Sequence, residues 1–157
     1  MLRKLTMLAS MLALMLAVAA PALAQTAPDA TLQTRPNPTV EDTATYHRLL
    51  LTNGGMEETQ NSRAELYIAT DNVKVLKTKI RYENGTIVRD ACSVVQEFGE
   101  TFITCRDIGS ISPDERVAVW IKTKYAEPGD YTVQGGHYGG DGTVSSDTDT
   151  VRVLPAS

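Results

Sequence analysis

The chain has two cysteines, Cys92 and Cys105, and their spacing limits the folds open to it. Twelve residues separate them, with Gly99 near the middle and the alternating segment 101–104 leading into the second cysteine. This arrangement suits a disulfide that closes a β-hairpin, either across two strands or from a strand to a loop. The other common uses of a cysteine pair are a metal site and a redox motif. The redox state of the cellular compartment indicates which of the three uses applies.

The first residues indicate export. A basic start precedes an apolar run over residues 7–20, and Ala22 and Ala24 supply the small residues of a cleavage site. This pattern predicts a secretory signal peptide, residues 1–24. An uncleaved membrane anchor is the alternative, because the apolar run is nearly long enough to span a bilayer, but Pro21 and the Ala-Leu-Ala motif favour cleavage. In the oxidising compartment that export implies, the two cysteines predict a disulfide.

Charge and length bound the mature chain. Removal of the signal peptide leaves 133 residues with 13 basic and 19 acidic side chains, a formal charge of −6. This length suits one domain with a hydrophobic core. No run of basic residues occurs, which argues against nucleic acid and against anionic lipid as the partner. No further apolar run of membrane length occurs, so we expect a soluble protein, secreted or periplasmic, without stable membrane insertion.

Alternating segments between turn signals predict an all-β fold. The strands expected are short, seven or eight in number, and no helical period of useful length follows the signal peptide. The main segments are 43–52, 64–68, 73–83, 86–95, 101–105, 116–124, 131–133 and 151–153. This pattern is typical of an antiparallel β-sandwich or a small barrel.

The predicted domain boundaries follow from composition. Residues 25–42 contain Pro28, Pro36 and Pro38 and little to bury, so they are predicted to be an extended linker. The folded domain is predicted over 43–154, with 155–157 as a tail.

Local patterns predict particular turns and faces. Asn84-Gly85 predicts a two-residue type I′ hairpin turn, which would place Tyr82 opposite Ile87 and Arg81 opposite Val88. Residues 112–115 predict a turn with proline at its second position. In two further segments the period of two predicts which side chains point the same way. His47, Leu49 and Leu51 share one face of their strand, and Val117, Val119 and Ile121 share one face of theirs.

Trp120 and Lys122 point away from the face predicted to be buried. An exposed tryptophan is enriched at interfaces, so these two residues are the candidate partner patch. The alternative is that the register is opposite or that the N-terminal segment covers Trp120.

Several of these motifs together resemble a known family. The first motif follows the first expected strand and is Thr52-Asn53-Gly54-Gly55. The second lies between Cys105 and Ile121 and is Ile108-Gly109-Ser110-Ile111-Ser112-Pro113-Asp114-Glu115, followed by a Val-Ala-Val-Trp-Ile strand. The third is Pro128-Gly129-Asp130-Tyr131-Thr132-Val133. From about Thr43 to Val153 the chain resembles the conserved-repeat domain of unknown function found in bacterial and archaeal surface and secreted proteins. That resemblance implies an immunoglobulin-like sandwich and supplies no catalytic residues. Asp114 departs from the family, which usually has glycine there.

Catalysis and cofactor binding find no support in the sequence. His47 and His137 are the only histidines, no Gly-x-Ser-x-Gly motif occurs, and a disulfide would remove both thiols as nucleophiles. A hydrolase would require one histidine to meet a serine and a carboxylate in space. We therefore expect no enzyme activity and no cofactor.

A calcium site is the remaining metal hypothesis. Asp141, Asp147 and Asp149 offer oxygen ligands, but their spacing fits no EF-hand loop, so a polar hairpin loop is the favoured interpretation and no metal ligand is assigned.

Taken in order, these observations predict a secreted, non-catalytic immunoglobulin-like module of the bacterial cell envelope. Its role would be structural, adhesive or protein-binding, with an envelope protein or glycan as partner. The alternative is a secreted carbohydrate- or calcium-binding domain, for which Trp120 or the loop around Asp141 would supply the site.

Overall fold

The computed structural model describes residues 28–157, and the predicted signal peptide, 1–24, lies outside them. The described residues form strands and no helix. The strands are β1 (Pro28–Arg35), β2 (Thr39–Val40), β3 (Ala44–Asn53), β4 (Thr59–Ile68), β5 (Val73–Tyr82), β6 (Ile87–Arg89), β7 (Cys92–Glu97), β8 (Glu100–Ile111), β9 (Arg116–Tyr125), β10 (Gly129–Tyr138) and β11 (Val144–Leu154).

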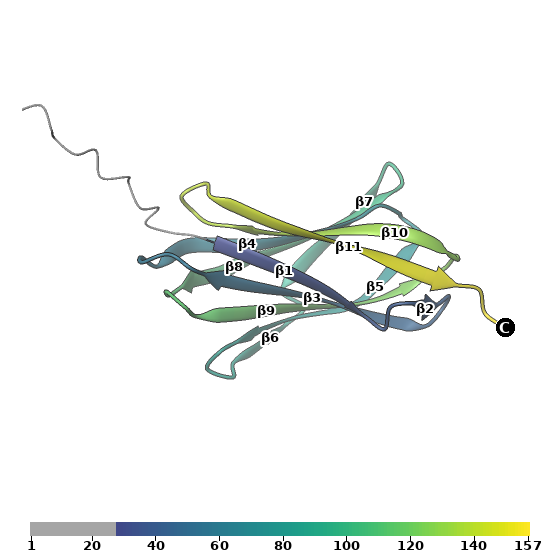
Figure 1. Ribbon diagram of the computed structural model, residues 1–157, viewed down its shortest axis with the longest axis horizontal. Helices are drawn as coiled ribbons and strands as arrows, with labels where there is room; N and C mark the ends of the chain where they lie inside the picture. Colours follow the sequence, from purple (N-terminus) through teal and green to yellow (C-terminus); the bar gives the residue numbers. More distant parts are fainter. Residues whose placement is uncertain (1–27) are drawn as a thin grey trace, which may run out of the picture.

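These strands make two sheets that lie face to face as the layers of an elongated sandwich (Figure 1). Sheet A has the order β1-β3-β9-β5-β6, and sheet B has the order β2-β11-β10-β4-β8-β7. Neighbouring strands are antiparallel except for the short β2, which runs parallel to β11. The predicted all-β sandwich is confirmed, with eleven strands rather than seven or eight. No helix of membrane-spanning length and hydropathy occurs within residues 28–157.

Alternation along each strand decides which side chains fill the space between the sheets. His47, Leu49 and Leu51 of β3 are buried, and the corresponding residues of β9 are Val117, Val119 and Ile121, as their period of two predicts. Sheet B supplies the opposite half of the core, which includes Ala64, Leu66, Ile68, Ile103, Val133 and Val151. Each large aliphatic side chain buried in this way contributes about 1.5–3 kcal/mol.

Most of the predicted linker, residues 25–42, belongs to the sandwich, which corrects that prediction. β1 pairs with β3 along its whole length, and β2 pairs with the end of β11. Ala30, Leu32 and Thr34 of β1 are buried, so the segment does alternate. Its prolines stand at the first residue of the strand and after its last, where they interrupt no ladder.

The edge of β1 is closed by carboxylates from the other sheet. The backbone N–H groups of Leu32 and Thr34 donate to the side chains of Asp147 and Asp149, over 2.8 and 3.0 Å. A strand at the edge of a sheet has unpaired amides, and burial without partners would be costly. These two aspartates on β11 therefore stabilise β1 in its place at the edge of sheet A.

The Asn84-Gly85 turn forms a hairpin, but its register differs from the predicted one. Arg81 lies opposite Ile87, and the N–H of Tyr82 donates to the carbonyl of Thr86 over 2.9 Å. Within this loop only Gly85 has a positive φ, 87°. The loop therefore has three residues, a type I turn followed by a glycine bulge, and this extra residue moves every cross-strand pair by one.

The cysteine hairpin contains the two-residue turn instead. Phe98 and Gly99 have φ values of 53° and 78° and join a pair of directly opposed residues, Glu97 and Glu100. Positive φ at both central positions defines a type I′ turn. Cys92 and Cys105 lie directly opposite each other on β7 and β8 and form a disulfide, with 4.1 Å between their Cα atoms. The predicted disulfide is confirmed.

Candidate functional site: a cationic sheet face

The outer face of sheet A gathers basic side chains from all five of its strands. They point away from the core on alternate positions, and several line shallow depressions around Trp120. We call the following residues the cationic face: Arg35 (β1), Arg48 (β3), Lys77, Lys79 and Arg81 (β5), Arg89 (β6) and Lys122 (β9).

Strand register brings these residues together in rows that cross the sheet. One row reads Gln33, Arg48, Trp120, Lys79, Arg89 from β1 to β6. The next row reads Arg35, Tyr46, Lys122, Lys77. Adjacent strands lie about 4.8 Å apart, so each row places cations and rings side by side on a nearly flat surface.

Trp120 is at the centre of this face. Its ring lies between two cations: the Arg48 guanidinium is 5.5 Å and the Lys79 ammonium 5.2 Å from the ring centroid. Lys122 lies 5.5 Å from the Tyr46 ring in the same way. Depressions of about 210, 250 and 260 Å³ meet at Trp120. Trp120 is half-buried, and both it and Lys122 point outward, on the face where their spacing placed them.

No side chain of the cationic face forms an ion pair within residues 28–157, although Glu83 lines the depression beside Arg48 and Arg81. The ion pairs formed by residues 28–157 are Arg63 with Glu65 and Lys124 with Asp42, and neither includes a residue of the cationic face. The Nε of Arg48 is buried and has no hydrogen-bond partner within the chain. The face therefore concentrates uncompensated positive charge on a protein whose net charge is negative.

This clustering corrects one step of the sequence argument. No basic run exists along the chain, yet seven of its 15 basic residues meet on one face. The prediction that nucleic acid is not the partner rested on the lack of a basic run, and the cationic face removes that support. The signal was present as a period of two in Lys77, Lys79 and Arg81, which indicates one face of a strand.

The two histidines belong to buried hydrogen-bond networks. His47 contacts the hydroxyls of Thr34, Thr123 and Tyr125 at 3.0–3.2 Å. Burial lowers its pKa from 6.5 to about 4, and the charge of Asp149 opposes part of this shift. His47 therefore remains neutral at pH 7.

The second network contains the contact that the hydrolase hypothesis required. His137 Nε2 lies 3.3 Å from the Ser62 hydroxyl, and its Nδ1 lies 3.2 Å from the backbone carbonyl of Asp29. Both side chains are completely buried, and the Ser62 hydroxyl also contacts Thr59 at 2.9 Å. A nucleophile needs access to substrate, so this pair satisfies buried polar groups rather than forming an active site.

The carboxylates of the calcium hypothesis are engaged elsewhere. Asp147 and Asp149 accept the β1 amides, and Asp141 accepts the backbone N–H of Thr143 over 3.0 Å within its own turn. Within residues 28–157, no three His, Cys, Asp or Glu side chains are grouped as a metal site. The three aspartates have roles in the architecture of β1 and of the β10–β11 turn.

Comparison with known proteins gives structural neighbours only. No family model matches the chain, and no match was found among curated proteins. Among solved structures, a protein titled as catalysing macrocyclization in alchivemycin A biosynthesis, AvmM, has a TM-score of 0.54 at 12% identity, over 85% of this chain and 92% of that one. A cohesin module of a Clostridium perfringens family 33 glycoside hydrolase has a TM-score of 0.52 at 14% identity, over 83% and 99%.

A third neighbour is the C-terminal domain of the AgI/II polypeptide BspA of Streptococcus agalactiae. Its TM-score is 0.52 at 13% identity, and the match covers 80% of this chain but half of that one. At these identities the likeness concerns the fold alone, which is an immunoglobulin-like sandwich. The conserved-repeat family itself is not matched.

Proposed function

We propose that this chain is a non-catalytic adhesive module of the bacterial cell envelope, and that it binds an acidic partner through the cationic face. The observation that carries the proposal is the row of Arg48, Trp120, Lys79 and Arg89 across four strands, with no carboxylate paired to it. The expected signal peptide 1–24 and the disulfide support a site of action outside the cytoplasm. The surface-protein folds among the neighbours are consistent with such a role.

A long anion fits this surface better than a small one. Clustered like charges repel each other, and a bound polyanion removes that repulsion while releasing its own counterions. The face is a broad sheet surface with shallow depressions, so many weak contacts rather than one deep pocket would provide affinity. The exposed faces of Tyr46 and Trp120 add apolar contact between the charges.

The partner proposed is an acidic glycan, one that carries carboxylates along its chain. Such polymers occur outside the cytoplasm, which is the side of the membrane that the predicted signal peptide 1–24 implies. A lipid bilayer fits less well, because Trp120, the central aromatic ring of this face, lies half-buried between Arg48 and Lys79.

Binding to polygalacturonate tests this proposal, with dextran as the uncharged control polymer. The mature chain, residues 25–157, would be titrated at several salt concentrations. We expect binding that weakens linearly in log salt, and a Kd at least about tenfold higher for a Lys79→Ala/Arg89→Ala double variant, because two charged contacts are lost. The matched control is Arg106→Ala/Arg152→Ala, which removes two exposed cations from sheet B.

Two results would contradict the proposal. One is an equal loss of affinity in both double variants, which would mean that net charge and not the cationic face decides binding. The other is tighter binding of a single-stranded oligonucleotide than of polygalacturonate at the same salt concentration, which would assign the face to a nucleic acid.

A further inference from the structure

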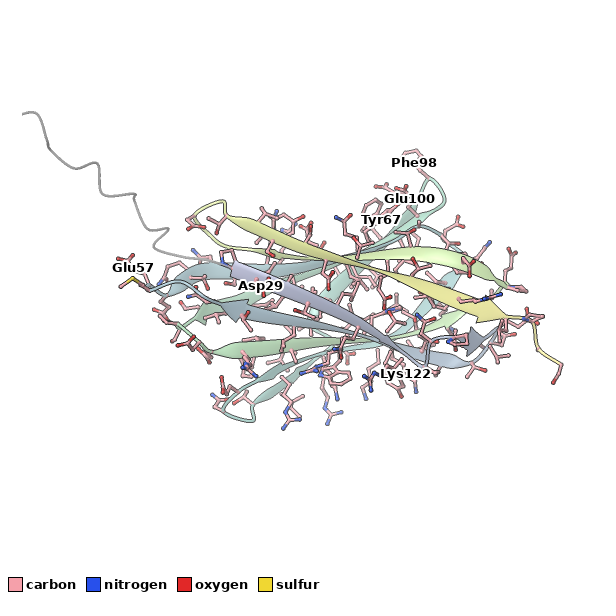
Figure 2. All side chains as sticks on the ribbon, viewed as in Figure 1. Asp29, Glu57, Tyr67, Phe98, Glu100 and Lys122 are labelled. Atoms are coloured by element: carbon pink, nitrogen blue, oxygen red, sulfur yellow. A yellow bond between two sulfur atoms is a disulfide. The ribbon has the colours of Figure 1, made fainter. Side chains whose placement is uncertain are left out.

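A groove of about 360 Å³ crosses the outer face of sheet B, on the side of the sandwich away from the cationic face. Figure 2 shows Tyr67 and Glu100 projecting from one side of the molecule and Lys122 from the other. The groove is lined by exposed and half-buried side chains of β4, β8, β10 and β11: Glu65, Tyr67, Glu100, Phe102, Thr104, Gln134, Tyr138 and Ser146.

The groove exists because one position in its floor has no side chain. Gly136 lies in a cross-strand row between Ser146 and Glu65, with Thr104 beyond. A Cβ at position 136 would come within 2.9 Å of the Tyr138 ring. Glycine therefore leaves the floor open and also lets the Tyr138 ring lean across it.

Aromatic rings form the walls. Tyr67 and Phe102 are a cross-strand pair whose ring centroids are 5.4 Å apart at a tilt of 48°. Tyr138 stands on the other side, with the Arg63 guanidinium 4.6 Å from its ring centroid. Phe102 is 37% exposed, so part of its ring is open to a ligand.

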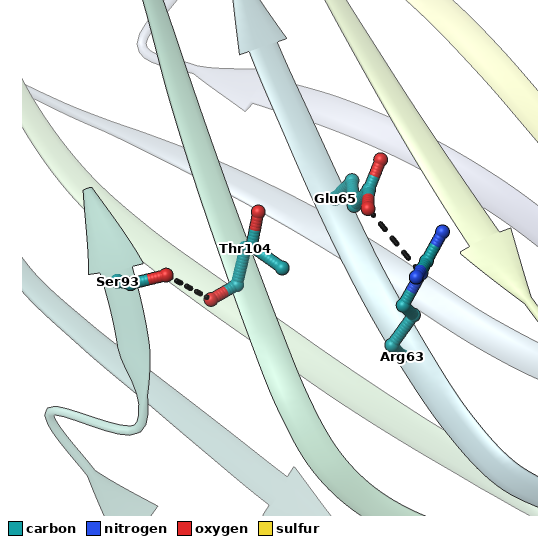
Figure 3. Close-up of polar contacts among 4 residues, drawn as sticks. All are labelled: Arg63, Glu65, Ser93 and Thr104. Atoms are coloured by element: carbon teal, nitrogen blue, oxygen red, sulfur yellow. Dashed lines mark hydrogen bonds and ion pairs between the residues drawn. The ribbon is translucent and has the colours of Figure 1, made fainter. Parts of the chain in front are cut away.

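Polar contacts within the sheet hold these walls in position. The Tyr67 hydroxyl donates to Glu100 over 2.7 Å. Arg63 pairs with Glu65 at 3.3 Å, and the Ser93 hydroxyl donates to the carbonyl of Thr104 over 3.3 Å, as Figure 3 shows. The bond to Glu100, followed by burial, raises the pKa of Tyr67, so the phenol stays protonated at ordinary pH.

The charged groups that line the groove are carboxylates, which accept hydrogen bonds. Glu100 has a second carboxylate oxygen beyond the one bonded to Tyr67, and Glu65 is shared by Arg63 and the Tyr138 hydroxyl. The Gln134 amide and the Thr104 and Ser146 hydroxyls can donate or accept. Carboxylates beside flat rings suit a ligand that has hydroxyl donors on its edge and C–H groups on its face. An anion would be repelled by the two carboxylates.

We infer that this groove binds a short segment of a neutral glycan, with sugar C–H faces on Tyr67, Phe102 and Tyr138 and sugar hydroxyls donating to Glu65 and Glu100. The inference is independent of the cationic face, because the two sites share no residue and lie on opposite sheets. A module with both sites would connect an acidic polymer to a neutral one.

The test is an NMR titration of the ¹⁵N-labelled mature chain with maltohexaose, cellohexaose and chitohexaose. At least one of the three should shift the amides of Tyr67, Phe102 and Tyr138 while those of the cationic face stay in place. Phe102→Ala should weaken binding at least tenfold, as should Gly136→Val, which fills the floor. The control is Phe98→Ala, which removes a 93% exposed aromatic ring from the turn between β7 and β8 and should leave the affinity unchanged.

A well-dispersed spectrum of each unliganded variant would show that the variant is folded. Gly136→Val guards against a purely structural effect of Phe102→Ala, because it leaves Tyr67 and Phe102 unaltered and fills the floor beside the Tyr138 ring. The inference is overturned if none of the three sugars shifts the groove amides, if the shifts appear on the cationic face, or if Phe98→Ala weakens binding as much as Phe102→Ala does.

Discussion

Phe98 has a backbone conformation that bulky residues rarely adopt. Its φ is 53°, its side chain is 93% exposed, and it occupies the first central position of the type I′ turn in the cysteine hairpin. Asparagine and glycine are the residues usually found there. The ring makes no contribution to the core, so the turn carries the cost of a positive φ without a packing gain.

Replacing Phe98 by asparagine should therefore stabilise the protein. We expect the free energy of unfolding to rise by about 0.5–1 kcal/mol, because asparagine adopts positive φ more readily. Urea denaturation measures this change. Phe98→Ala is the control, since it removes the ring but retains the conformational cost; a gain as large as that of Phe98→Asn would show that ring exposure and not φ is responsible.

His47 gives the stability of the protein a dependence on pH. Burial places its folded-state pKa at about 4, whereas in the unfolded chain it is near 6.5. Between these values the unfolded chain binds a proton that the folded chain does not, so stability is complete above pH 6.5 and falls as pH decreases toward 4. The full effect is about 3 kcal/mol. The pKa of His137 is lowered by burial too, and it acts in the same direction.

Denaturation by urea at pH 7 and at pH 4.5 tests this dependence. The loss of unfolding free energy on acidification should be clearly smaller in His47→Gln than in the original chain, even though the substitution itself lowers stability at pH 7. Equal losses in the two proteins would mean that His47 does not titrate as its burial implies.

At the level of elements, β1 is the strand whose existence depends most on its neighbours. Only Ala30 and Leu32 bring apolar side chains to the core, and the amides on its outer edge rely on Asp147 and Asp149. A bond from an amide to a charged acceptor contributes about 1.5–3 kcal/mol when it is protected from solvent. These two acceptors are partly exposed, so the lower end of that range applies.

Asp147→Ala should consequently loosen β1. We expect a destabilisation of about 1.5 kcal/mol and faster amide hydrogen exchange at Leu32, measured by NMR. Asp130→Ala, which removes an exposed carboxylate on β10, should change neither quantity. If calcium protects the Leu32 amide in the original chain and not in Asp147→Ala, the calcium hypothesis would replace this structural role.

For the whole molecule, the sandwich separates two kinds of surface. The cationic face covers sheet A, and the aromatic groove with its carboxylates lies on sheet B. Concentrating cations on one face has a cost in self-repulsion, which is typical of surfaces retained for binding.

A Lys77→Ala/Arg81→Ala variant should reveal this cost. At low salt we expect this variant to be as stable as the original chain, or more stable by at most about 0.5 kcal/mol in unfolding free energy. Its affinity for polygalacturonate should fall. Added salt should raise the Tm of the original chain more than that of the variant, because salt screens the repulsion that the variant lacks. Thermal unfolding at two salt concentrations gives the result; a large drop in the Tm of the variant would indicate that these side chains stabilise the fold.

Much of the fold could be predicted from local chemistry. The period of two places Leu49 and Leu51 inside and Trp120 outside whatever the partner strand is, because side chains alternate across any strand. The pairing of Cys92 with Cys105 needs only that the chain be oxidised, since no third cysteine competes. The turn at Ser112–Glu115 is equally local, and the N–H of Glu115 donates to the carbonyl of Ser112 over 3.0 Å.

Tertiary structure decided the rest. β1 is a strand because β3 and the aspartates of β11, more than a hundred residues away along the chain, satisfy its backbone. The register of the hairpin at Asn84-Gly85 differs by one residue from the predicted register, because within that loop only Gly85 has a positive φ. The sequence by itself determined which face of each strand its residues occupy. The order of strands in each sheet decided which of those residues meet, so only the folded molecule could assemble seven scattered cations around Trp120 or open a groove at Gly136.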